Sequence, residues 1–378
     1  MKMKTRAYPY NLVFNILICL SLSTSAFAGA EGDIEIKKAY NKQFSADKNT
    51  VVELSNRYGK INVNTWDKSE VKIDVTVIVK AGSKSKAEDK LNEISVGINK
   101  NGNNIVAVTE ISSSNSSWWS GWWNGSNNVK IEINYEIFMP ADLHSIIENK
   151  YGNIYLPNLK GKTSINLKYG NLQARDITND LLMDIAYGKA TVGEVNNLSG
   201  NLSYSDYRGT SAGVVILTTK YSKVHLDNAK TFTSSSKYDS YRLGTVNTLT
   251  LTGAYDDIQI GSMGTGTLNT KYSGIDISSL SSVLTSDISY GSLTIENLKT
   301  SFKSITVNTS YAPVKIYGVV PAKVEVEGKY FDADLGADFI QKHKVSEGSS
   351  KVIKGYKISD KTGAVINITS KYGDVIIR

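Results

Sequence analysis

The stretch Ile165-Asn166-Leu167-Lys168-Tyr169-Gly170-Asn171-Leu172-Gln173-Ala174 decides the fold of this chain. Before Tyr169, apolar and polar residues alternate, which is the pattern of a strand with one buried face. By this parity, Tyr169 points inward with Leu167. Gly170-Asn171 then makes a bend, because both residues tolerate a positive φ better than most, and the inward face resumes at Leu172. The segment predicts two short strands joined by a corner.

This corner recurs through the back two-thirds of the chain. Twelve tyrosines occupy equivalent positions: Tyr151, Tyr169, Tyr187, Tyr204, Tyr221, Tyr238, Tyr255, Tyr272, Tyr290, Tyr311, Tyr330 and Tyr372. The first eight steps are 17 or 18 residues, the next two are 21 and 19, and the last gap of 42 holds an insertion. A period this short, without helical patterning, predicts an all-β fold, a β-solenoid (β-helix) of 17–18-residue coils.

Each coil repeats the same inside–outside pattern. Positions three, five and eight after the tyrosine are apolar in nearly every coil, as Ile258, Ile260 and Met263 are after Tyr255, while the fourth position is polar. Parity places the tyrosines inside as well, as an internal stacked ladder. The alternative interpretation is a row of aromatic ligand contacts.

The N-terminus has the features of a secretory signal peptide, residues 1–28. Three basic residues precede a short apolar core, and Ala26-Phe27-Ala28 supplies a cleavage site. The apolar stretch is too short for a membrane span, and no second one follows, so no transmembrane segment is expected in the mature chain. We therefore expect an exported protein that is periplasmic, outer-envelope-associated or extracellular. The only cysteine, Cys19, lies in the segment to be removed.

Net charge excludes one class of partner. The formal charge is +7, and removal of Lys2, Lys4 and Arg6 lowers it to near +4. This is mild for a chain of this length and argues against nucleic acid as a ligand. The oligomeric state is not decided by the sequence.

Residues 29–150 are β-rich but lack the tight period, and they predict an N-terminal cap before a repeat domain over 151–378. Tyr58-Gly59-Lys60-Ile61 is an early copy of the repeat motif. The spacing of Ala87 and Leu91 predicts one short helix between Ser83 and Ile94. A cap covers the open edge of the first coil. The final residues, 372–378, predict one last solenoid strand.

A tryptophan cluster interrupts the cap region. Trp118, Trp119, Trp122 and Trp123 lie in a run of Ser, Asn and Gly, which predicts a loop. The cluster is a candidate platform for a sugar, a partner or a membrane surface, because Trp is enriched at such sites. The alternative is a hairpin tip whose indoles fold back on the sheet.

Residues able to do chemistry are sparse. The three histidines are far apart, no phosphate-binding loop or nucleophile elbow is present, and we predict no cofactor, no metal site and no enzyme. Asp239, Asp256 and Asp257 fall at the corners of neighbouring coils, where they could bind a cation or act as an acid–base pair, although corner Asp is also ordinary turn chemistry. A second candidate is a set of three basic residues that occupy the same outward position on three successive coils: Arg208, His225 and Arg242. This column is a candidate site for an acidic glycan, and the alternative is an ordinary solvated face.

The chain resembles the bacterial putative-adhesin family of β-strand-repeat (Tyr-Gly-x-Ile repeat) exported proteins. The motifs that carry the resemblance are Lys150-Tyr151-Gly152-Asn153-Ile154, Lys168-Tyr169-Gly170-Asn171-Leu172 and Lys371-Tyr372-Gly373-Asp374-Val375, together with Trp66-Asp67. The resemblance implies an exported β-solenoid and supplies no catalytic residues.

Three functions follow as hypotheses. The first is an adhesin-like, non-catalytic surface or envelope protein that binds a glycan or a surface protein. The second is a periplasmic structural scaffold or envelope-stress component that binds a protein partner. The third, which the sequence favours least, is a polysaccharide-active β-helix enzyme.

Overall fold

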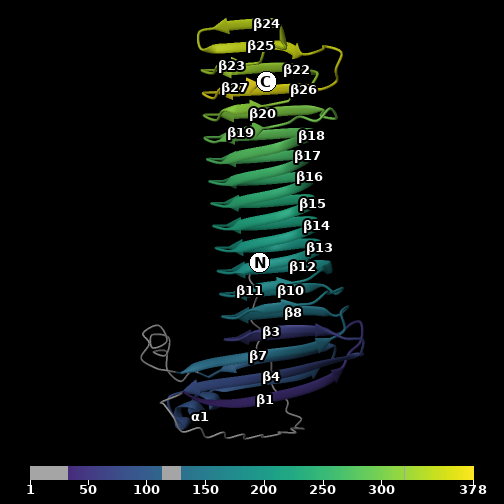
Figure 1. Ribbon diagram of the computed structural model, residues 1–378, viewed down its shortest axis with the longest axis vertical. Helices are drawn as coiled ribbons and strands as arrows, with labels where there is room; N and C mark the ends of the chain where they lie inside the picture. Colours follow the sequence, from purple (N-terminus) through teal and green to yellow (C-terminus); the bar gives the residue numbers. More distant parts are fainter. Residues whose placement is uncertain (1–32, 113–128, 319) are drawn as a thin grey trace.

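The computed structural model describes residues 33–112, 129–318 and 320–378. They form a tall stack of strands whose single described helix lies near the base (Figure 1). The expected all-β solenoid, with coils of about 17–18 residues and one short helix, is confirmed. No helix in these three segments is long and apolar enough to cross a membrane.

The base consists of antiparallel and parallel pairs. Its strands are β1 (Ile34–Ser45), β2 (Val51–Arg57), β3 (Ile61–Thr65), β4 (Glu70–Ala81), β5 (Ile94–Asn101), β6 (Asn104–Ile111) and β7 (Lys130–Met139). β4 pairs antiparallel with β1 and β7, and β5 pairs antiparallel with β6. Helix α1 (Lys84–Asn92) begins after Ser83, whose side chain accepts a hydrogen bond from the Lys86 N–H, and it buries Ala87.

The early copy of the motif joins this base to the stack. β2 pairs in parallel with β8 (His144–Lys150), and β3 pairs with β9 (Ile154–Leu156). The ring of Tyr58 therefore stacks on that of Tyr151, with centroids 5.4 Å apart, although 92 residues separate the two in the sequence. A segment far away in sequence thus provides the first coil.

The middle of the molecule is a regular parallel stack. Its strands are β10 (Thr163–Lys168), β11 (Asn171–Ala174), β12 (Ile177–Ala186), β13 (Lys189–Ser203), β14 (Asp206–Lys220), β15 (Lys223–Lys237), β16 (Ser240–Ala254), β17 (Asp257–Lys271) and β18 (Gly274–Ser289). From β13 onward each strand runs along one sheet, around the corner opposite the tyrosines and back along the second sheet. Every coil therefore presents two outward faces.

The predicted apolar positions form the core between the two sheets. Ile258, Ile260 and Met263 are buried, as are their equivalents in neighbouring coils. Phe232 fills the middle of the stack, where its ring meets the buried ring of Tyr241 edge-on at 6.0 Å. Because every coil adds the same layer, the core is a continuous column.

The C-terminal strands do not follow chain order. They are β19 (Ser292–Ile295), β20 (Ser304–Ser310), β21 (Val314–Ile316), β22 (Ala322–Lys329), β23 (Ala333–Asp334), β24 (Phe339–Glu347), β25 (Ser350–Lys357), β26 (Val365–Lys371) and β27 (Val375–Ile377). β26 pairs in parallel with both β20 and β22. The final stretch is a solenoid strand, as predicted, but it lies inside the stack, and the hairpin β24–β25 lies at the end (Figure 1). The prediction that it is the last coil is wrong.

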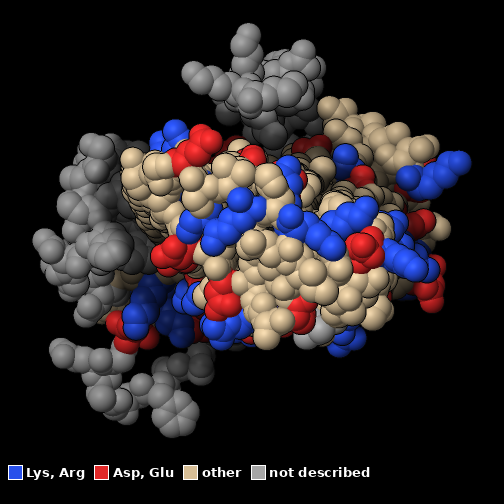
Figure 2. Space-filling view, turned by 90° about the horizontal axis from the view of Figure 1, so that it is seen from above, with Lys and Arg blue, Asp and Glu red and all other residues tan. Residues whose placement is uncertain are grey.

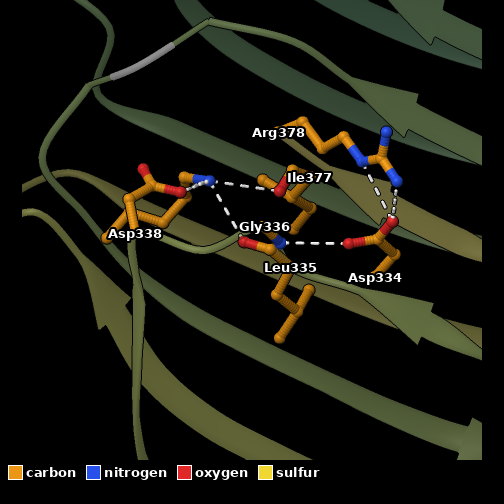
Figure 3. Close-up of polar contacts among 7 residues, drawn as sticks. Asp334, Leu335, Gly336, Asp338, Ile377 and Arg378 are labelled. Carbon is orange, nitrogen blue, oxygen red and sulfur yellow. Dashed lines mark hydrogen bonds and ion pairs between the residues drawn. The ribbon is translucent and has the colours of Figure 1, made fainter.

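A buried lysine on β25 hydrogen-bonds to the final strand, β27. Lys357 is almost fully buried, and its Nζ donates to the carbonyl oxygen of Ile377 at 3.1 Å and to Asp338 Oδ1 at 2.6 Å. A buried ammonium group such as that of Lys357 is tolerated only when it is paired in this way. Arg378 pairs with Asp334 beside it (Figure 3).

Seen end-on, the molecule carries basic and acidic side chains interspersed (Figure 2).

Candidate functional site

The tyrosines form a ridge along one edge of the solenoid. We call the following eleven residues the tyrosine ridge: Tyr169, Tyr187, Tyr204, Tyr221, Tyr238, Tyr255, Tyr272, Tyr290, Tyr311, Tyr372 and Tyr330, in stack order. Successive rings are nearly parallel, with centroids 4.6–5.1 Å apart. Each of these residues is 39–57% exposed. The ridge is therefore a stacked aromatic row that faces solvent.

This placement corrects the expectation that the rings are internal. Every ridge tyrosine has a φ between +51° and +64°, the left-handed region. One left-handed residue interrupts the alternation of the strand, so the tyrosine side chain turns outward and the following residue turns inward. The stacking was predicted correctly, but the side was not. The signal in the sequence was the parity shift at each Tyr–Gly step.

The glycine after the tyrosine serves a different purpose from the one expected. The tyrosine itself takes the positive φ, whereas Gly170 and Gly188 do not. A Cβ on Gly170 would lie 2.0 Å from the carbonyl oxygen of Gly152 in the coil below. Glycine is needed at these corners because two backbones approach closely.

Where the glycine is replaced, a column of buried oxygens takes its place. Ser205, Ser222, Asp239, Asp256 and Ser273 are all buried at this corner. The side-chain oxygen of each accepts a hydrogen bond from the backbone N–H of the equivalent residue one coil below, at 2.6–3.3 Å. The column satisfies N–H groups that the bend would otherwise leave unpaired.

The two aspartates of this column are structural. Asp239 and Asp256 are each 4% exposed, and burial raises the pKa of both carboxyl groups. Asp256 Oδ2 also accepts from Ser236 Oγ at 2.7 Å. Asp257 is exposed on the adjacent sheet and does not join them. No three His, Cys, Asp or Glu gather as a set of metal ligands anywhere in the described segments.

Lysines border the ridge. Six exposed lysines directly precede ridge tyrosines: Lys168, Lys220, Lys237, Lys271, Lys329 and Lys371. The Nζ of Lys220 lies 5.5 Å from the ring centroid of Tyr221, and that of Lys237 lies 5.2 Å from the ring of Tyr238. Within the described segments, none of the six forms an ion pair with an acidic side chain. The ridge thus combines aromatic edges with uncompensated positive charge.

The basic column is assembled as predicted. Arg208, His225 and Arg242 lie opposite one another on β14, β15 and β16 and continue a line from Thr191. His225 Nε2 lies 3.0 Å from Asp227 Oδ1, so one of the three column residues already has an acidic neighbour. A ligand for the column stays a prediction. Trp118, Trp119, Trp122 and Trp123 lie outside the described residues.

Comparisons with known proteins indicate no family. No family model and no curated protein matches the chain. The structure of a putative cell adhesion protein from Clostridium sporogenes is similar at 12% identity, with 90% of this chain and 99% of that chain covered and a TM-score of 0.17. A putative adhesin from Parabacteroides merdae is 13% identical (75% and 94% covered, TM-score 0.32), and a putative lipid binding protein from Parabacteroides distasonis is 10% identical (90% and 97%, TM-score 0.22). At these values the likeness is too low to bear on ligand or activity.

Proposed function

We propose that this protein is an exported, adhesin-like, non-catalytic binding protein of the cell envelope or cell surface, and that the tyrosine ridge is its contact with an extended, anionic ligand. The observation that carries the proposal is the row of half-exposed rings bordered by unpaired lysines. A solenoid is suited to such a ligand, because its surface repeats once per coil over many coils.

The geometry of the rings selects the kind of ligand. From Tyr169 to Tyr372, both faces of each ring are covered by neighbouring tyrosines, so a sugar ring cannot lie flat on them. The exposed parts are ring edges, and no ridge hydroxyl has a hydrogen bond to another described residue. Phenol hydroxyls donate hydrogen bonds, and lysines supply positive charge, which together favour phosphate or carboxylate groups along a polymer.

Charge variants test the ridge. The triple variant Lys220→Gln, Lys237→Gln, Lys271→Gln removes three ridge cations. The matched triple Lys160→Gln, Lys230→Gln, Lys299→Gln removes three exposed lysines near the corner opposite the tyrosines. If each contact is worth about 0.5 kcal/mol, the ridge triple weakens binding to polygalacturonate by about tenfold. Binding should also fall with added salt, because exposed charges are screened.

The matched triple keeps the same net charge, so it should bind as the wild type does. Biolayer interferometry measures the binding of the wild type and of both triple variants to polygalacturonate and to neutral dextran. Equal losses in the two triples would assign binding to net charge alone, and absence of binding to either polymer would remove the anionic ligand.

A second candidate is a periplasmic scaffold or envelope-stress component that binds a protein partner. It is favoured by the abundance of exposed tyrosine, since Tyr is enriched at the energetic centres of protein interfaces. Protease treatment of intact host cells that produce the tagged protein separates the two. Cleavage would place the solenoid outside the cell, and protection until the envelope is opened would favour the periplasmic partner.

A further inference from the structure

The sheet that runs into the ridge presents a second regular surface. Two outward columns cross its middle, and we call their threonines the threonine face. The first column contains Thr231, Thr248 and Thr265. The second contains Thr233, Thr250, Thr267, Thr285 and Thr306, on the consecutive coils β15, β16, β17, β18 and β20.

The two columns are free of charge. Between β14 and β20, the other members of the two columns are Val214, Ile216, Val283 and Ser304. Soluble proteins usually spread charged side chains over every surface. The opposite sheet does so, with Lys189, Arg208, Lys223 and Asp257. The absence of charge thus distinguishes the two middle columns of this sheet. The next outward column includes the exposed Asp287, and the one beyond it holds the ridge lysines Lys220, Lys237 and Lys271.

The side chains of the face are available and evenly spaced. Thr250, Thr267, Thr285 and Thr306 are exposed, and their hydroxyls have no hydrogen bond to another residue of the described segments. Along a strand, alternate side chains lie about 6.6 Å apart, and neighbouring coils lie about 4.8 Å apart. The coils stack as one straight column (Figure 1). The result is a two-dimensional grid of hydroxyl and methyl groups.

The composition of the grid excludes most ligands. It has no cation for a phosphate polymer and no aromatic ring on which a sugar could stack. Serine, threonine and valine are under-represented among residues that dominate protein interfaces. What remains is a flat, uncharged partner with its own regular spacing of hydrogen-bonding atoms.

We propose that the threonine face binds the surface of ice. Water oxygens on the faces of an ice crystal repeat in two dimensions, with spacings of the same order as the two spacings of the grid. The hydroxyls hydrogen-bond to lattice waters, and the methyl groups between them limit other arrangements of water. The backbone is already fixed by the coils on both sides, so little conformational entropy is lost on binding. This inference concerns a different surface and does not rest on the ridge.

The test is ice growth in the presence of the purified protein. Nanolitre osmometry and ice-recrystallisation assays compare the wild type with Thr250→Lys/Thr267→Lys, which places two long charged side chains in the middle of the grid. We expect the wild type to show thermal hysteresis and to arrest recrystallisation, and the double variant to lose both. The control is Thr191→Lys/Thr294→Lys, the same change on the opposite sheet, which should retain both.

A second variant guards against misfolding. Thr250→Val/Thr267→Val keeps the shape and strand preference of threonine but removes the hydroxyls, and circular dichroism checks that every variant melts as the wild type does. The double valine variant should weaken both the thermal hysteresis and the inhibition of recrystallisation. A wild type without hysteresis or recrystallisation inhibition overturns the proposal, and so does an equal loss in the control. Self-association or sedimentation with insoluble cellulose through this face, without an effect on ice, would assign another occupant and overturn it too.

Discussion

The lower and middle coils of the solenoid differ in the residue that follows the tyrosine at the corner. In the lower coils, Gly152, Gly170 and Gly188 follow the left-handed tyrosine, and each lets its coil approach the backbone of the coil below. In the middle coils, Ser205, Ser222, Asp239, Asp256 and Ser273 take that position, and their buried oxygens accept N–H groups from the coil below. The tyrosine ridge continues unbroken across both.

The difference teaches that the tyrosine defines the repeat and the next residue is adjustable. The choice also follows coil length. Where the step from one tyrosine to the next is 18 residues, the second tyrosine is followed by glycine: Gly170, Gly188 and Gly291. Where the step is 17 residues, it is followed by Ser or Asp. The register shifts of β12–β13 and β17–β18 place the extra residue near the opposite corner. Length and corner chemistry therefore vary together while the ring spacing stays constant.

The largest expected effect comes from adding a side chain to a glycine corner. In Gly170→Ala, the new Cβ would lie 2.0 Å from a backbone oxygen, which cannot move without shifting a coil. We expect a loss of about 3 kcal/mol in the free energy of unfolding. Gly82→Ala is the control, because a Cβ there meets nothing within 4 Å.

Urea titration followed by circular dichroism measures both glycine variants. Gly170→Ser should be no better than Gly170→Ala, although serine is native at the middle corners. A stable Gly170→Ser would show that the two kinds of corner are interchangeable.

A smaller loss is expected from an oxygen corner. Asp256→Ala removes the acceptor of the Asp239 N–H and of the Ser236 hydroxyl, both of which are buried. Buried donors without an acceptor should lower the stability by about 2 kcal/mol. The neighbouring Asp257→Ala, at an exposed position, should change it by less than about 0.5 kcal/mol. Similar losses in the two would contradict the structural role of Asp256.

The smallest effect is a dependence on pH. Burial raises the pKa of Asp239 and Asp256 in the folded state above the ordinary value of 3.8. The folded protein then binds more protons than the unfolded chain as pH rises above that value, so this contribution to stability is full below it and is lost toward neutral pH. The double variant Asp239→Asn/Asp256→Asn should lack this part of the slope.

Denaturation midpoints from pH 3.5 to 7 test this sign. The difference between wild type and the double variant isolates the two aspartates from the other carboxyl groups. A difference that grows more favourable to the wild type as pH rises would mean that the native state prefers both carboxylates charged.

Much of the architecture was predictable from local patterns. Alternation of apolar and polar residues identified the strands, the spacing of tyrosines gave the coil length, and Ala87 and Leu91 located the helix. The equal period also predicted that Arg208, His225 and Arg242 would align. These features are determined by the sequence itself, because a side chain's direction in a strand depends only on its neighbours in the chain.

Three features were decided only by the tertiary structure. The left-handed backbone at each tyrosine, which sends Tyr169 and its equivalents outward, is held by the coils above and below it. The order of the coils at both ends depends on pairings between distant segments, as Tyr58 on Tyr151 and β26 between β20 and β22 show. The threonine face exists only once separate strands lie in register. Contacts between coils fix all three features. The parity shift at each tyrosine marks where the alternation breaks, but one strand alone specifies neither the backbone conformation there nor the order of the coils.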